Sequence, residues 1–74
     1  MEYTHKIISD PHIMLGKPVI KGTRIPVELL LRKLSEGMSF DEVLAAYPHL
    51  TYENLLAALS YSADVIEREE LLVS

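Results

Sequence analysis

One short segment, rich in turn-forming and basic residues, constrains the fold of this chain more than any other. Residues 16–27 (GKPVIKGTRIPV) contain two glycines, two prolines and three cations. Glycine permits backbone angles that other residues avoid, and proline removes a backbone donor, so no regular helix is expected here. The segment therefore predicts a short β-arm that leads into a helical body.

The residues before this segment indicate how the arm is built. Residues 7–9 form a short β-like run that ends at the turn pair Asp10–Pro11. Two further apolar runs, 13–14 and 19–20, lie on either side of Gly16. We expect these two runs to form a tight hairpin in which Gly16 supplies the special backbone angle of the turn.

Two helices are expected directly after the arm. The first begins at Pro26 and ends near Gly37, because proline suits the first turn of a helix and glycine suits its end. The second begins after Ser39, which forms a capping box with Glu42. Pro48 ends it, since the residue before a proline resists the helical conformation.

A third and longest helix is expected after the cap residue Thr51, with a helical pattern that continues to about residue 70. The fold class is therefore mainly α: a short N-terminal β-arm or hairpin followed by a three-helix bundle. We expect one domain over residues 1–74, with the arm in 1–25 and the helical body in 26–70.

The size of the chain favours a homo-oligomer. A chain of 74 residues buries only about 60% of the surface that its unfolded form exposes, so a monomer is marginal. No cysteine is present to stabilise it, yet 49% of the residues are apolar. A two-fold dimer would satisfy both facts, with the arms contributing to the contact, and a compact monomer is the alternative.

The charge is distributed unevenly along the chain. The net charge is −4, but residues 1–33 carry six cations and three carboxylates, whereas residues 34–74 carry one cation and eight carboxylates. Such asymmetry indicates two different surfaces with two different partners. The alternative is that these charges only keep a small protein soluble.

Several function classes find no support in the sequence. His5, His12 and His49 have no metal-binding spacing, and no serine lies in a nucleophile motif. We therefore expect no metal, no cofactor, no catalytic residue and no enzymatic activity. No apolar run approaches the length of a membrane span, and no secretory leader is evident, so we expect a cytoplasmic protein with no membrane partner.

The short connection between the second and third helices, residues 48–51, is compatible with a helix-turn-helix, although helical bundles without a DNA role share it. Asn54, in the first turns of the third helix, could read adenine. No arginine or lysine lies between residues 34 and 67, so phosphate contacts would come from the arm and the first helix. The candidate DNA-binding residues are Lys17, Lys21, Arg24, Arg32, Lys33, Thr51, Tyr52 and Asn54.

Several spaced motifs resemble one bacterial family. They are Asp10–Pro11, the string GKPVIKGTRIPV of residues 16–27, and the string EGMSFDEVLAAYPHLTYENLLAALSY of residues 36–61. In this order they resemble the family catalogued as domain of unknown function 433, over about residues 8–63. Members of that family look like antitoxins of VapB type with a homeodomain-like helix-turn-helix, commonly encoded beside a toxin with a PIN-like nuclease domain.

The resemblance implies a dimeric DNA-binding antitoxin of a type II toxin–antitoxin pair, which neutralises a PIN-like ribonuclease and represses its own operon. The surface expected to bind the toxin is the acidic end of the third helix and the apolar residues after it, namely Glu67, Glu70, Leu71 and Leu72. Two alternatives remain open. One is a protein-interaction module that does not bind DNA, and the other is a stand-alone small transcriptional regulator.

Overall fold

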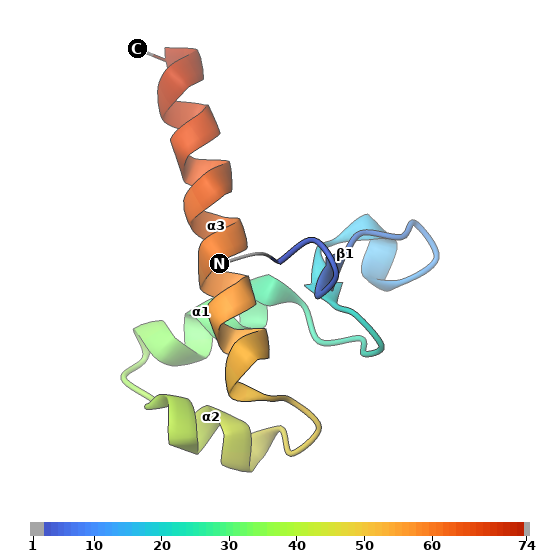
Figure 1. The fold of residues 1–74 in the computed structure, drawn as a ribbon, viewed down its shortest axis with the longest axis vertical. Coiled ribbons are helices and arrows are strands. Elements are labelled where there is room, and N and C mark those ends of the chain that lie inside the picture. Colours follow the sequence, from blue (N-terminus) through green and yellow to red (C-terminus); the bar gives the residue numbers. More distant parts are fainter. Residues whose placement is uncertain (1–2, 74) are drawn as a thin grey trace.

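The computed structural model describes residues 3–73, and for residues 70–73 it describes the backbone alone. The elements follow the order β1 (Ile7–Ile8), η1 (Met14–Gly16), β2 (Val19–Ile20), α1 (Val27–Ser35), α2 (Phe40–Ala46) and α3 (Tyr52–Val73). The fold is mainly helical, with a two-stranded antiparallel arm followed by three helices, as the sequence predicted (Figure 1).

The pairing within the arm differs from the expected hairpin. Val19–Ile20 pairs with Ile7–Ile8, in a register that places Ile7 opposite Ile20 and Ile8 opposite Val19. Residues 13–14 do not form a strand, because Ile13 only bridges Asp10 and the chain then enters the short 3₁₀ turn η1. The prediction of a tight hairpin around Gly16 was therefore wrong, although Gly16 does adopt a positive φ of 84°.

The arm also fixes the start of the first helix. Val19 bridges Pro26, and the backbone N–H of Val27 donates to the carbonyl of Pro18 at 2.9 Å. Pro26 has extended angles and is the residue before the helix, so α1 begins one residue later than predicted. Proline is tolerated there because the first helical N–H groups have no partner within the helix.

The ends of the other helices agree with the sequence signals. Gly37, just after α1, has φ 97°, which only glycine adopts readily. Ser39 and Glu42 form the predicted reciprocal capping box at the start of α2. At α3, the N–H of Asn54 donates to the Thr51 hydroxyl at 3.2 Å, and the N–H of Thr51 donates to the Asn54 carboxamide oxygen at 2.9 Å.

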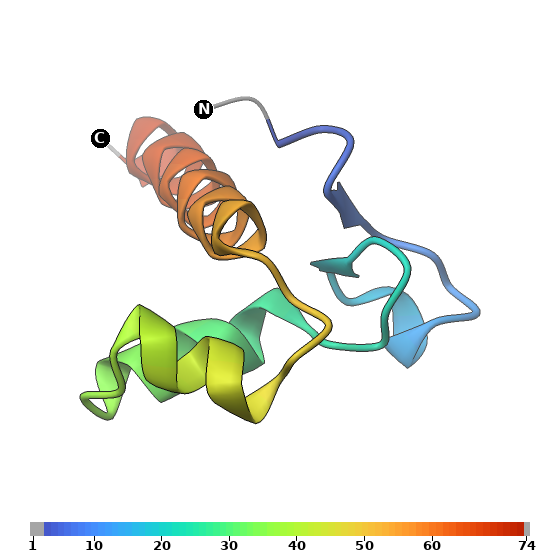
Figure 2. The same cartoon turned by 60° about the horizontal axis from the view of Figure 1, so that its bottom comes forward.

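The core lies where the arm and the three helices meet. Buried side chains come from β2, the three helices and the connection before α3: the core cluster contains Ile20, Val27, Leu30, Val43, Leu50, Leu55 and Ala58. Tyr47 and Tyr61 are half-buried and pack against this cluster. In Figure 2, α1 and α2 lie side by side on one side of α3, and the arm lies on the other side of the α1 start.

Helix α3 is longer than predicted and extends well beyond the other elements (Figure 1). The backbone of residues 71–73 continues this helix instead of forming a separate segment, so the body reaches Val73. Within residues 3–73, no helix combines the length and the apolar character that a membrane crossing requires.

Candidate functional site

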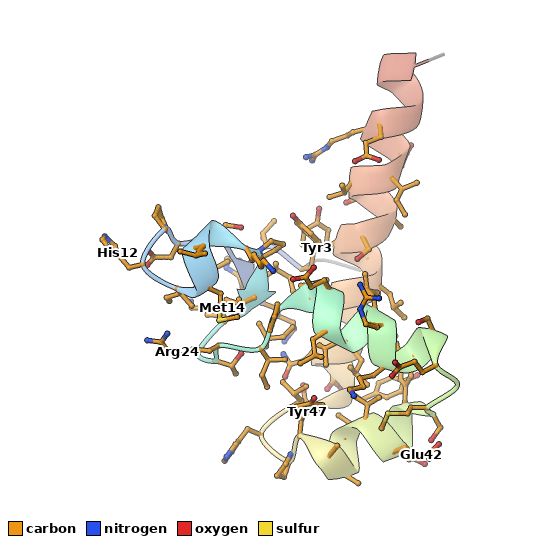
Figure 3. The ribbon with its side chains drawn as sticks, turned by 180° about the vertical axis from the view of Figure 1, so that it is seen from behind. Tyr3, His12, Met14, Arg24, Glu42 and Tyr47 are labelled. Atoms are coloured by element: carbon orange, nitrogen blue, oxygen red, sulfur yellow. The ribbon has the colours of Figure 1, made fainter. Side chains whose placement is uncertain are left out.

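Two arginines flank a hollow between the arm and the first helix. Arg24 comes from the turn before α1 and Arg32 from its last turns, and the hollow has a volume of about 450 Å³. Its apolar lining is formed by Met14, Ile25, Pro26 and Leu29. Arg24 points away from the helical body, on the side of the molecule where the arm carries His12 (Figure 3). The carboxylate of Glu28 also lines the hollow, so it offers two cations and one anion beside an apolar floor.

A tight turn presents Arg24 in this position. The hydroxyl of Thr23 donates to the carbonyl of Ile20 at 2.7 Å and accepts the N–H of Ile25 at 3.0 Å. Gly22 has φ 82°, which lets the chain reverse just after β2. Because both sides of the turn are hydrogen-bonded, the exposed Arg24 projects from a defined backbone.

The five cationic candidates are not equivalent. Lys17 forms an ion pair with Glu28, and the hydrogen bond from Lys17 holds the pKa of the Glu28 carboxyl below its ordinary value. Lys33 lies 4.0 Å from Glu36 on the same helix. Within the part of the chain that the structure describes, Lys21, Arg24 and Arg32 are exposed and form no ion pair. These three cations are the ones available to an anionic partner.

The first turn of α3 is less available for base reading than the sequence suggested. The carboxamide oxygen of Asn54 already accepts the N–H of Thr51, whereas a bidentate contact with adenine needs that oxygen. The Tyr52 ring is 53% exposed but lies against Phe40 of α2, with ring centroids 5.4 Å apart. Glu53 adds a negative charge beside them. Thr51 is exposed and acts as the helix cap.

The acidic candidates lie on the projecting half of α3, apart from the hollow. Glu67 is exposed, and so are its neighbours Arg68 and Glu69. The side chains of Glu70, Leu71 and Leu72 lie outside the described residues. Arg24 and Arg32 thus line one hollow, whereas Glu67 belongs to α3, the helix that projects beyond the other elements (Figure 1).

Sequence reasoning missed a polar contact that ties the N-terminal segment to α3. The hydroxyl of Tyr3 donates to Asp64 Oδ2 at 2.8 Å, and its ring meets Tyr61 edge-on at 5.7 Å between centroids. The hydrogen bond to Asp64 raises the pKa of the Tyr3 hydroxyl above its ordinary value. No spacing rule links residues that are 61 positions apart, so the sequence held no signal for this contact.

A second missed feature is the left-handed turn at the tip of the arm. Met14 and Leu15 have φ 50° and 59°, although neither is glycine, and the Leu15 side chain is 93% exposed. Such angles are uncommon for residues with a Cβ atom. The only local signal was Gly16, which shares the turn. Among the described residues, no group of three or more metal-binding side chains comes together.

Comparison with known proteins assigns the chain to a family. A family model described as "Protein of unknown function (DUF433)" matches residues 7–62, which cover the arm and most of the helical body. This chain belongs to the DUF433 family. The assignment agrees with the resemblance carried by the motifs at residues 16–27 and 36–61.

Two relatives have no characterised function. The uncharacterized protein y4eO of Sinorhizobium fredii (strain NBRC 101917 / NGR234) is 36% identical over 56 residues, which are 76% of this chain and 25% of that protein. An uncharacterized protein of Archaeoglobus fulgidus is 56% identical over 27 residues, which are 36% of this chain and 75% of that protein.

A solved structure shares the fold. The 2.00 Å crystal structure of a DUF433 member protein from Anabaena variabilis ATCC 29413 has a TM-score of 0.81 and 37% sequence identity. The similarity covers 88% of this chain and 64% of that chain. This DUF433 chain therefore spans a quarter of the Sinorhizobium relative and less than two thirds of the Anabaena protein.

Proposed function

We propose that this DUF433 protein is the antitoxin of a type II toxin–antitoxin pair. It binds and neutralises a PIN-like ribonuclease, and it binds operator DNA as a dimer in the cytoplasm, with no catalytic activity, cofactor or membrane partner of its own. The observation that supports the proposal most is the separation of charge: Lys21, Arg24 and Arg32 lie on the arm and α1, and Glu67 and Glu69 on the projecting half of α3. Two partners could therefore bind at once.

The nuclease partner would use the acidic helix. A ribonuclease holds its substrate with a basic surface, and an acidic helix such as residues 64–70 complements such a surface. Residues 67–69 of this helix are all exposed, so a partner can reach their side chains. Leu71 and Leu72 would add apolar contacts in the same proposal.

Operator DNA would contact the cationic side instead. Phosphate neutralisation supplies most of the affinity of a DNA-binding protein. The three unpaired cations Lys21, Arg24 and Arg32 are suited to that role, whereas the first turn of α3 contributes mainly Thr51 and the exposed edge of Tyr52. A dimer would double the number of these cations, which favours binding across two half-sites.

Co-purification with the neighbouring gene product tests the antitoxin role. The chain is expressed with its genomic neighbour, a tag is placed on the neighbour alone, and the mass of the complex is determined by light scattering. We expect a stable complex that also suppresses the toxicity of the neighbour. Glu67→Lys should weaken the complex, while Glu36→Lys on the exposed end of α1 serves as the matched charge control. A neighbour that does not bind, or whose toxicity persists, refutes the proposal.

The DNA-binding part is tested separately by its salt dependence. We expect the double variant Arg24→Ala/Arg32→Ala to reduce the slope of log K against log salt by about 2, or about one for each lost phosphate contact. Lys33→Ala is the matched control. Lys33 lies 4.0 Å from the carboxylate of Glu36, so its removal should change the slope less than the removal of an unpaired arginine. If the affinity for the promoter region does not depend on the salt concentration, the proposal that these arginines contact phosphates is contradicted.

One observation favours the alternative of a protein-interaction module that does not bind DNA. In the first turn of α3, Asn54 serves the helix cap, Tyr52 lies against Phe40, and Glu53 repels phosphate. A helix with these features would read bases poorly. If the nuclease complex forms but the promoter fragment is not bound at low salt, this alternative replaces the DNA-binding part, and the antitoxin role remains.

A further inference from the structure

The outward face of α3 carries an apolar stripe that the single chain covers only in part. Its members are Tyr52, Leu56, Leu59, Ala63 and Ile66. Tyr52, Leu59 and Ile66 are 53%, 38% and 55% exposed, Ala63 is exposed, and Leu56 is half-buried. The side of α3 that packs on the body is a different one, formed by Leu55, Ala58, Tyr61 and Val65. A helix on the surface of a monomer normally presents polar residues outward.

The spacing of this stripe is that of a helix–helix seam. Its members follow one another at alternating intervals of four and three residues, which average to the 3.5-residue repeat of a coiled coil. No charged residue belongs to the stripe between Tyr52 and Ile66. Ile66 also borders a shallow apolar groove with Leu31 and Pro18, so the apolar surface continues from α3 onto α1 and the arm.

We propose that a second copy of this chain covers this stripe, through antiparallel pairing of the two α3 helices about a two-fold axis level with residue 61. In that register, Leu56 packs against the partner's Ile66, and Leu59 packs against the partner's Ala63. The symmetry repeats both layers on the other side of the axis. Each central layer therefore combines a leucine with an alanine, which lets the two helices approach closely.

The structure offers two reasons for this occupant and this direction. A second copy brings the same 3.5-residue spacing, so four of the five stripe residues, those at positions 56, 59, 63 and 66, pair with one another across the axis. Antiparallel pairing lays the projecting half of each α3, whose residues 67–69 are exposed, along the body of the other copy (Figure 1).

The arms offer less to a partner than the sequence suggested. Each strand has only two residues. Within β2, Val19 pairs with Ile8 and also forms a bridge with Pro26, so both edges of this strand are occupied at Val19. Both residues of β2 are buried within the single chain. Little free strand edge is therefore left for pairing between arms. The α3 stripe is the larger apolar surface available to a second copy.

Oligomeric state tests the proposal directly. Light scattering and sedimentation should show the isolated chain as a dimer at micromolar concentration. Ile66→Glu should weaken dimerisation by more than about a hundredfold, because the change occurs twice in a two-fold interface. Leu15→Glu is the matched control, since Leu15 is 93% exposed at the arm tip and its variant should remain a dimer. A monomeric wild type, or a dimer that survives Ile66→Glu with its helix content intact, overturns the proposal.

The direction of pairing is tested by cross-linking, for which the chain is well suited because it contains no cysteine. A mixture of Leu56→Cys and Ile66→Cys chains should form a cross-link between the two variants under mild oxidation. Either variant alone should not, because position 56 faces position 66 and not itself. Cross-linking of Ile66→Cys with itself would indicate parallel helices and would overturn the antiparallel register.

A charge reversal provides a second test of the register. The antiparallel arrangement places Glu53 beside the partner's Glu67, which is a repulsive pair on the flank of the seam. Glu67→Lys should therefore tighten the dimer severalfold, and Glu53→Lys/Glu67→Lys should cancel that gain. In a parallel pair, Glu67 would face the neutral Ser62 instead, and the second change would not cancel the first. Additive effects of the two substitutions would refute the register.

Discussion

Replacing Leu15 by glycine should stabilise the fold, because the arm tip holds this residue in an unfavourable conformation. Leu15 has φ 59° and ψ 30°, and the left-handed region costs a non-glycine residue about 1–2 kcal/mol. Its side chain is 93% exposed, so removing it sacrifices almost no buried apolar surface. Glycine also increases the entropy of the unfolded chain, which costs about 0.5–1 kcal/mol. The net gain in the free energy of unfolding should be about 0.5–1 kcal/mol.

Urea unfolding followed by circular dichroism measures this gain, at one fixed protein concentration so that association does not change. The melting temperature should rise by about 2–8 °C for a domain of this size. Leu15→Ala is the matched control: it removes the same side chain but keeps the left-handed penalty, so its stability should stay within about 0.5 kcal/mol of the wild type. If the glycine and alanine variants are equally stable, the backbone reasoning is refuted.

Three further changes test the core and the polar contacts. Leu30→Ala should destabilise the fold by about 2–5 kcal/mol, because Leu30 is fully buried in the core cluster, and urea unfolding measures the loss. Hydrogen bonds from Ser39 lower the pKa of Glu42. The stability that Glu42 contributes is therefore present at neutral pH and is lost as the pH falls below 4.5. In the Glu42→Gln variant, the melting temperature should depend less on pH in that acidic range. The raised pKa of Tyr3 means that its contribution is lost as the pH rises past 10.0, and Tyr3→Phe should remove that alkaline decline while the ring contact with Tyr61 remains.

The helical part of the fold could be predicted because its signals are local. The capping box of Ser39 and Glu42, the cap at Thr51 and the terminating Gly37 all act within one turn of a helix. The pairing of the arm depends on tertiary context instead. Val19 and Ile20 are buried by contacts with Ile7 and the helices, and nothing in the local spacing favours residues 7–8 over 13–14 as their partner.

The residues of the candidate site could be predicted from the sequence, but their arrangement in space could not. The sequence identified Arg24 and Arg32 as cations, and the structure places both beside one hollow because the Thr23 turn directs Arg24 outward near α1. It could not show that Lys17 is paired with Glu28, since the two lie on different elements. The role of Asn54 was also undetermined, because an asparagine in the first turn can cap a helix or face a base equally well.

The third helix shows why an apolar pattern alone does not reveal what covers it. From the sequence, one apolar stripe is expected on this helix, formed by Tyr52, Leu55, Leu56, Leu59, Ala63 and Ile66, as a single core-facing surface would require. The structure divides them: Leu55 is buried on the body, whereas the others belong to an exposed 3.5-residue seam. A helix with two apolar faces can bury both of them only if each face packs against another element. In this chain of 74 residues, the body covers one face of α3 and leaves most of the other exposed. The second face therefore indicates that α3 packs against a partner. Cross-linking between positions 56 and 66 tests whether that partner is another copy of the same chain.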